Sequence, residues 1–304
     1  MRVRVTTVLG IVMLAVAAGC GVWLVNRVGG YEADAAVVDA AREASDAGLA
    51  DPSATDGWVP DVDEALLRRV DFDAFSHDAP DATRWLSVPG TAIDGPVMQE
   101  RQVGVWAYDL ADMYGRHNGI GSYLTPALRE GSTDGHLVVL AHRMNGFFGE
   151  WQFSMLEPRW GSEQGAREFP YVYLYYPDHS ERWLVWSGIE ARSDDVIYEL
   201  GHALGSDGYE AMLAHVADAG RYQACERPDR WCPTLMLSTC QTLESGELGR
   251  FALWCVPDMR YDYATGVTTD LLWEQGVVTW RAGCEADEAS RTAPASMQAE
   301  TGEA

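Results

Sequence analysis

The sequence predicts a mainly β domain with helical additions. In residues 171–190, two runs rich in aromatic residues flank the turn-forming PDHSE segment, which is typical of a β-hairpin. In residues 234–256, the apolar runs TLMLS and FALWCV flank a polar loop with two glycines and two glutamates, which indicates a second strand pair. Between these pairs, in residues 193–220, apolar residues recur at helical spacing, which predicts a helical insertion before the second strand pair.

The first 28 residues predict a membrane anchor. Arg2 and Arg4 precede residues 6–25, which carry no charge and are long enough for one membrane-spanning helix. Two early arginines followed by an acidic segment predict a cytoplasmic N-terminus and an extracellular remainder, so we expect a single-pass protein of the cell membrane. Two alternatives stay open, a signal-peptidase site at residues 15–17 and a poor lipobox ending at Cys20.

The rest of the chain divides by composition. Residues 29–61 are rich in Ala and Asp and predict an extracellular stalk, with a helix around residues 32–49. Residues 62–257 carry the predicted strands and form the folded domain, which opens with a short amphipathic helix over residues 63–70. Residues 258–284 form a C-terminal extension with one more helix or strand. Residues 285–304 lack apolar content and predict a disordered tail.

The charge balance bears on the class of partner. The 304 residues include 46 acidic residues and 22 arginines but no lysine, and the formal net charge is −24. Nucleic acid as a partner is therefore excluded, since its phosphates require clustered basic residues.

Six cysteines limit the covalent chemistry. Cys20 belongs to the membrane segment, and if Cys240 stays free, an even set of four remains. A pair of Cys225 with Cys232 would close a short loop before the 234–238 strand. A pair of Cys255 with Cys284 would tie the C-terminal extension to the last strand. The alternative is that the four are buried thiols. Their spacing does not match a zinc site, so we expect no metal. The four residues are Cys225, Cys232, Cys255 and Cys284.

One cysteine lies where a thiol can be both held and reached. Cys240 marks the point where the 234–238 strand gives way to a loop, and Arg250 opens the next strand ten residues later. Antiparallel pairing would bring the guanidinium to the thiol, where its charge favours the nucleophilic thiolate. A proton-transfer partner is His142, which ends the strand-like run 136–141. The three strand ends predict a cysteine-nucleophile site.

These motifs resemble those of the sortases, the cell-wall transpeptidases of Gram-positive bacteria, and of their class B branch in particular. The resemblance rests on TLMLSTC, the arginine ten residues later and a histidine 98 residues upstream of the cysteine. It extends to residues 68–99 and to GSYL at residues 121–124, and covers residues 62–257 in all. It implies a sortase-like closed β-barrel of about eight strands, with an N-terminal helix and a helical insertion before the cysteine strand.

The resemblance also implies a reaction. Cys240 would attack a backbone carbonyl in the C-terminal sorting signal of a secreted protein, and an amine of a cell-wall precursor or a pilin lysine would resolve the thioacyl enzyme. His142 would transfer protons and Arg250 would stabilise the oxyanion or hold the substrate backbone. Ser238 and Thr239 are candidate substrate contacts, although they equally serve the strand. Neither a cofactor nor a metal is needed.

Several positions depart from the family pattern and leave the substrate open. Ala141 and Arg143 flank the histidine where Gly and Asn are usual, Gln241 replaces an acidic residue, and Thr125 replaces an Asp. The signal, NPQTN-like or LPxTG-like, and wall anchoring or pilus assembly remain undetermined. An L,D-transpeptidase would need an SHGC-like motif, which STC does not supply. A catalytically degenerate sortase-like module for wall or pilus interaction is the other alternative, and reactivity of Cys240 would distinguish it.

Overall fold

The structure is a computed structural model. It describes residues 13, 18–22, 29, 36–50, 62–130, 135–143, 152–242, 246–266 and 268–270. Most of the predicted anchor, part of the stalk, the C-terminal extension beyond residue 270 and the predicted disordered tail lie outside the described residues. Among the described residues, no helix combines the length and the apolar character that crossing a membrane requires.

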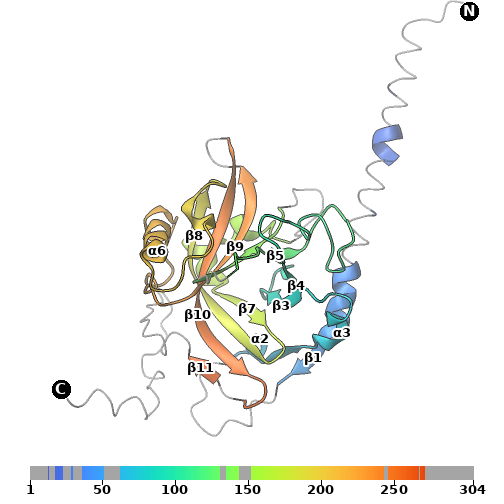
Figure 1. Cartoon of the computed structure of the whole chain (residues 1–304), viewed down its shortest axis with the longest axis horizontal. Coiled ribbons are helices and arrows are strands. Elements are labelled where there is room, and N and C mark those ends of the chain that lie inside the picture. The colour runs from blue at the N-terminus through green and yellow to red at the C-terminus, as the bar shows by residue number, and fades with distance from the viewer. Residues whose placement is uncertain are drawn as a thin grey trace, which may run out of the picture.

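Eight strands close into a barrel. They follow the order β10-β8-β7-β3-β4-β5-β6-β9, and pairing of β9 with β10 closes the circle (Figure 1). β11 pairs with the outer edge of β10, and β1 pairs with β2 in a separate two-stranded sheet. The predicted closed barrel of about eight strands is confirmed. The strands are β1 (Asp46–Leu49), β2 (Arg68–Val70), β3 (Ala82–Ser87), β4 (Asp94–Gln99), β5 (Tyr123–Thr125), β6 (His136–Leu140), β7 (Tyr171–Tyr175), β8 (His179–Ala191), β9 (Thr234–Thr242), β10 (Leu248–Asp262) and β11 (Thr268–Asp270).

Most helices are short, and three of them differ from the prediction. The stalk helix expected around residues 32–49 ends at residue 45, because Asp46–Leu49 form β1 and pair with β2. The helix expected over residues 63–70 ends at Leu67, because Arg68 turns extended and enters β2. In the insertion, only a 3₁₀ turn and one long helix form, because Gly201 and Gly205 take left-handed conformations that interrupt a helix between them. The helices are α2 (Glu64–Leu67), α3 (Asp73–Ser76), α4 (Leu156–Trp160), α5 (Glu163–Glu168), η2 (Val196–Tyr198) and α6 (Asp207–Ala219).

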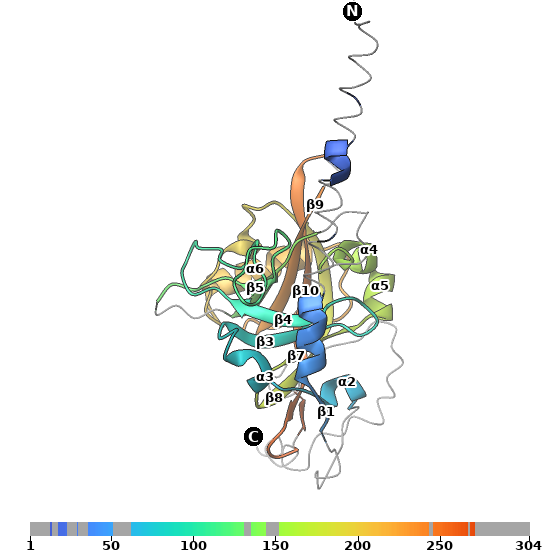
Figure 2. The ribbon, with the colours of Figure 1, turned by 90° about the vertical axis from the view of Figure 1, so that its right-hand side faces the viewer.

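The N-terminal elements cover one outer side of the barrel. Residues 36–45 are helical and run beside β4, where Arg42 pairs with Asp94 (Figure 2). α2 is fixed to the barrel by a buried ion pair: Arg182 donates from Nε to Asp258 at 2.6 Å and from Nη1 to Asp63 at 2.8 Å. Asp63 is also the N-cap of α2 and accepts from Leu66 N, so one carboxylate both starts the helix and attaches it.

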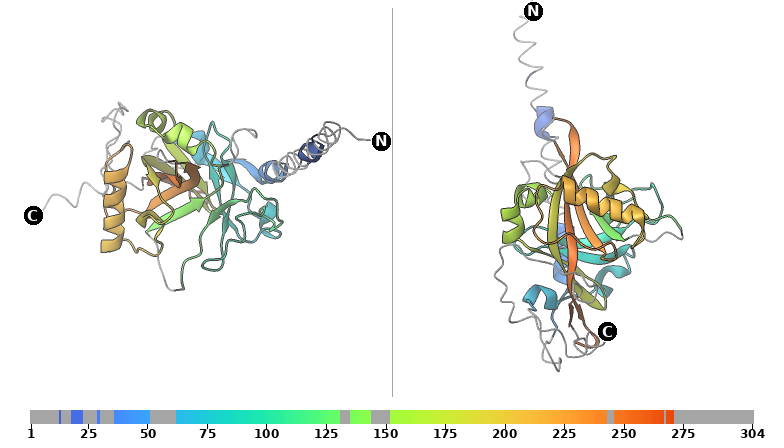
Figure 3. Two further views of the ribbon diagram at one scale, coloured as in Figure 1. Left: turned by 90° about the horizontal axis from the view of Figure 1, so that it is seen from above. Right: turned by 90° about the vertical axis from the view of Figure 1, so that its left-hand side faces the viewer.

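The insertion covers another outer side. α6 lies across the outer face of β8, β9 and β10 (Figure 3), and its Met212, Leu213 and Val216 pack with Trp186 and Trp254 in one buried cluster. On β9 this outer cluster includes Met236, four residues before Cys240. Along the outer face of β9, the residues therefore change from buried in this cluster at Met236 to exposed at Cys240.

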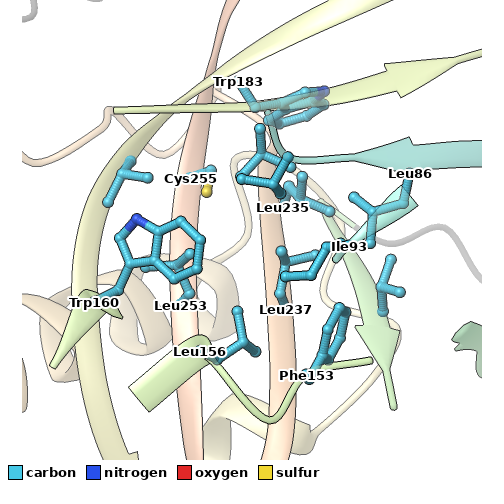
Figure 4. Close-up of a cluster of buried hydrophobic side chains, with 14 of the residues drawn as sticks. Leu86, Ile93, Phe153, Leu156, Trp160, Trp183, Leu235, Leu237, Leu253 and Cys255 are labelled. Carbon is cyan, nitrogen blue, oxygen red and sulfur yellow. The ribbon is translucent and has the colours of Figure 1, made fainter. Parts of the chain in front are cut away.

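The barrel interior holds a second apolar cluster. Leu235 and Leu237 of β9 point inward with Leu253 and Cys255 of β10, against Trp160 of α4 (Figure 4). Since side chains alternate along a strand, every other residue of β9 and β10 belongs to this inner cluster, and the residues between them face outward. The alternation decides which face of the barrel each site residue occupies.

The five described cysteines are free thiols, so the pair Cys225–Cys232 is not formed. Cys225, Cys232 and Cys255 are buried, which is the alternative that the sequence left open. Cys255 packs inside the barrel and burial raises the pKa of its thiol well above the usual value. Cys284 lies outside the described residues.

Breaking the buried ion pair should cost far more stability than breaking a surface pair. We expect Asp258→Ala to lower the free energy of unfolding by about 3–5 kcal/mol, because it strips the buried Arg182 of its closest carboxylate. The matched control is Glu163→Ala, which breaks an exposed pair with Arg167 and should cost about 0.5 kcal/mol. Urea unfolding of the full chain in mild detergent measures both, and equal costs would contradict the assignment.

His136 should make the fold sensitive to acid. Its ring is buried, stacks on Trp254 at 5.0 Å, and has its pKa lowered to about 3 by burial and, secondarily, by nearby His202. At a pH between about 3 and about 6.5, His136 binds a proton in the unfolded chain but not in the folded one. The free energy of unfolding is therefore highest above pH 6.5 and decreases as the pH falls below it. At pH 5, His136 should lower the free energy of unfolding by about 2 kcal/mol relative to its value above pH 6.5.

Urea unfolding between pH 4 and pH 7 tests this contribution. We expect His136→Phe, which keeps a ring against Trp254 but cannot titrate, to flatten the dependence. His77→Gln removes a fully exposed histidine and should leave the curve parallel to that of the unmodified chain. A His136→Phe curve with unchanged slope would show that other groups carry the acid sensitivity.

Candidate active site

The pairing of three strands brings the predicted site residues to one edge. β6 and β9 are parallel and in register from His136↔Thr234 to Leu140↔Ser238, and Ala141 N donates to Ser238 O at 3.2 Å just beyond. Two residues further along each strand come His142 and Cys240. On the other side of β9, Arg250 of the antiparallel β10 is the partner of Cys240. The carboxyl ends of β6 and β9 and the start of β10 therefore meet at one rim.

The thiol and the guanidinium are in contact. Cys240 is exposed, and Arg250 Nη1 lies 3.7 Å from its Sγ. The Arg250 guanidinium also lies over the ring of Tyr198, 5.5 Å from its centroid, which holds the cation in place. The guanidinium is thus placed to donate a hydrogen bond towards the sulfur.

His142 is the third residue at this rim. Its side chain is about one third exposed, and ring Nε2 lies 2.7 Å from the carbonyl oxygen of Asp109 and 3.3 Å from its carboxylate. Between the described atoms of His142 and Cys240 there is no direct hydrogen bond. The strand register, and not a side-chain contact, is what aligns them.

Ser238 and Thr239 do not lie where a substrate could touch their side chains. Both are completely buried. The Ser238 hydroxyl is 2.8 Å from the hydroxyl of Tyr198, whereas Thr239 faces the barrel interior by strand alternation. Their expected role as side-chain substrate contacts is therefore corrected: in this structure they serve the strand. Burial raises the pKa of Tyr198 to about 12, so its hydroxyl stays protonated at neutral pH.

Beneath the rim, on the inner face, an ion network joins the strand ends. Arg143 lies 3.7 Å from Glu157 of α4, and Arg221 pairs with both Glu157 and Glu190 of β8. Gln241 donates to the same Glu190 oxygen at 2.8 Å. The network thus runs from the residue after His142 to the residue after Cys240, and includes two of the positions that depart from the family pattern.

A cavity of about 380 Å³ lies behind the histidine loop, between helical residues 36–45 and the segment before β5. Gly121 and Gln152 are part of its wall, whereas His142, Cys240 and Arg250 are not. The cavity wall therefore adjoins the backbone of His142 through Gln152 but does not include the thiol.

Sequence reasoning did not identify Tyr198, Asp109 or Gln152. Each lies in an irregular segment or a 3₁₀ turn, where no periodicity indicates which way a side chain points. Tyr198 could have been suspected only from its place in the insertion that precedes the cysteine strand.

The comparisons with known proteins concern the fold. No protein-family model matches the chain, and no curated protein matches it in sequence. Among solved structures, sortase B from Bacillus anthracis in complex with AAEK1 matches with a TM-score of 0.57 and 16% identity, covering 75% of this chain and 97% of that chain. Sortase B from Clostridium perfringens matches with a TM-score of 0.54 and 18% identity, over 62% of this chain and 99% of the other.

A third match is a Staphylococcus aureus sortase B–substrate complex, with a TM-score of 0.52 and 15% identity, covering 61% of this chain and 83% of that chain. The three matched proteins come from three species and are covered over most of their length. The family resemblance drawn from the cysteine, histidine and arginine motifs is thus supported at the level of the fold. The chain has the sortase B-like fold.

Removing the guanidinium should slow the reaction of Cys240 with a thiol reagent. We expect Arg250→Met to lower the rate of iodoacetamide alkylation at pH 7 about three- to tenfold, because a unit charge near the thiol is worth ~1 kcal/mol in a water-like surrounding. Peptide mapping by mass spectrometry separates Cys240 from the other cysteines. Arg167→Met, which removes a cation from α5, is the control and should change nothing. An unchanged rate in Arg250→Met would show that the contact does not activate the thiol.

Proposed function

We propose that the chain is an extracytoplasmic cysteine transpeptidase of the sortase type. The observation that carries the proposal is the contact between the Arg250 guanidinium and the exposed Cys240 thiol, at the rim where strand pairing also brings His142. The sortase-like fold around this rim supports it. On this proposal the chain is held by its N-terminal segment at the outer face of the cell membrane.

The reaction begins with a thiolate at Cys240 and a protonated His142. The thiolate attacks the carbonyl carbon of the scissile peptide bond, while Arg250 donates hydrogen bonds to the oxyanion or the substrate backbone. The carbon–nitrogen bond breaks, the leaving amine takes a proton from His142, and a thioester to Cys240 remains. An incoming amine then attacks the thioester and gives its proton to His142, which restores the thiolate as the carbon–sulfur bond breaks.

The compared complexes support the proposed partners. One matched sortase B structure contains a substrate, and another contains triglycine. For this chain we infer a secreted protein with a C-terminal sorting signal as acyl donor and an amine as acceptor, from a cell-wall precursor or a pilin lysine.

Intact mass of the full chain in mild detergent, after incubation with a panel of sorting-signal peptides, tests the proposed reaction. We expect a mass gain that equals the N-terminal part of one peptide, because the C-terminal part leaves as the amine. Hydroxylamine should remove the adduct, and Cys240→Ala should not form it.

The remaining outcomes separate an enzyme from a binding module. A peptide that binds without any adduct, together with a Cys240 that resists alkylation, would contradict the transpeptidase and favour a wall or pilus interaction module. Triglycine added to the adduct should release a peptide longer by three glycines, whereas release of the free acid alone would contradict transfer to an amine.

A further inference from the structure

The ring of His142 is held from one side only. Its Nε2 lies 2.7 Å from the backbone carbonyl oxygen of Asp109 and 3.3 Å from the Asp109 carboxylate, and both are acceptors. Nε2 must therefore carry a hydrogen. A neutral imidazole has only one N–H, so Nδ1 is left as the basic nitrogen. Within the described part of the chain, Nδ1 has no hydrogen-bond partner.

The position of the Asp109 carbonyl is fixed by the turn around it. Ser122 N donates to Tyr108 O at 3.0 Å, and Asn118 N donates to Leu110 O at 3.0 Å, so both neighbours of Asp109 are bonded to the following loop. Gly121 makes this approach possible. A Cβ at Gly121 would lie 2.0 Å from the Asp109 oxygen, and the glycine has a φ of +79°. Only glycine fits both demands.

One amide then ties this turn to the backbone of the histidine. Gln152 accepts from His142 N at 3.1 Å through Oε1, and its Nε2 donates to Gly121 O at 2.8 Å. Gln152 itself has a φ of +45°, and no other non-glycine residue in the described part of the chain has a positive φ. Such a conformation costs free energy and persists where the surroundings enforce it. The segment from Asp109 to Gly121 thus holds the ring of His142 directly and its backbone through Gln152.

We propose that Asp109 is a positioning residue for proton transfer. Its carbonyl fixes the Nε2–H tautomer of His142, so that Nδ1 is the atom that gives the proton to the leaving amine and takes one from the incoming amine. Its carboxylate stabilises the imidazolium present before each acylation. The inference rests on the proposed function for its role in the reaction, but the tautomer is a property of the unreacted chain.

Nitrogen-15 NMR of the histidine rings tests the tautomer without any substrate. The full chain in detergent is compared with His142→Gln, whose missing signals assign the His142 ring. At a pH where the ring is neutral, we expect Nε2 to show the shift of a protonated nitrogen and Nδ1 that of an unprotonated one. The opposite pattern would overturn the proposal.

Two glycine variants test whether the Asp109 carbonyl is the cause. Gly121→Ala places a methyl group against that carbonyl and should shift His142 towards a mixture of tautomers. Gly115→Ala is the matched control: it lies in the same loop with a φ of +75°, but a Cβ there meets no atom within 4 Å. Gly115→Ala should introduce the same strain of a non-glycine residue at positive φ as Gly121→Ala, but leave the His142 tautomer unchanged. A native tautomer in a folded Gly121→Ala chain would contradict the assignment.

The carboxylate is tested separately in the reaction. Asp109→Asn keeps the backbone carbonyl and should keep the tautomer, while the single-turnover rate of adduct formation falls about three- to tenfold with unchanged half-saturating peptide concentration. Asp78→Asn, at an exposed aspartate, is the control and should react normally. Full activity of Asp109→Asn would refute the carboxylate's role. If no peptide forms an adduct with any variant and Cys240 resists alkylation, the proposed function fails, whereas the NMR result still decides the tautomer.

Discussion

The parallel pairing of β6 with β9 is the interaction on which the site depends. It aligns two strand ends that are about a hundred residues apart in sequence, and it completes the circle of strands because β9 also pairs with β10. The register of this pairing decides which face each site residue occupies. Side chains alternate with a period of two, so a slip of one residue would turn Cys240 into the barrel interior and Gln241 to the outer face. The apolar inner residues Leu235 and Leu237 resist such a slip.

The alternation also separates two tasks. Cys240 and Arg250 face outward, beside Tyr198 and the cluster under α6, whereas Gln241 and Glu190 face inward. The thiol and the guanidinium therefore lie on the accessible face, and a network of ion pairs holds the strand ends from the opposite face. Gln241, which departs from the class B pattern, belongs to the inner set. Its departure from that pattern therefore concerns how the rim is supported.

How much could be predicted from the sequence depended on whether a signal was local. The hairpin of β7 and β8 and the pairing of Cys240 with Arg250 follow from apolar runs and a short loop, and both are present. The alignment of His142 with Cys240 is not local: the end of the 136–141 run indicated His142 as a candidate, and the family resemblance supported it, but no short-range signal fixes the pairing of β6 with β9. The predicted end of α2 was three residues beyond the observed one. Arg68 leaves the helix because it pairs with Asp94 and with a residue of β1, and both partners are distant in sequence. Nothing in the sequence pattern points to Asp109.

The site residues are held by two different kinds of structure. Cys240 and Arg250 are fixed by sheet pairing that also closes the barrel, so their contact persists whenever the barrel folds. The ring of His142 is fixed instead by Asp109, Gly121 and Gln152, which contribute to the histidine's orientation and not to barrel closure. The position of the thiol and the orientation of the histidine ring therefore depend on different contacts. Loss of the contact between His142 and Asp109 would thus be compatible with an intact barrel and an unchanged contact between Cys240 and Arg250.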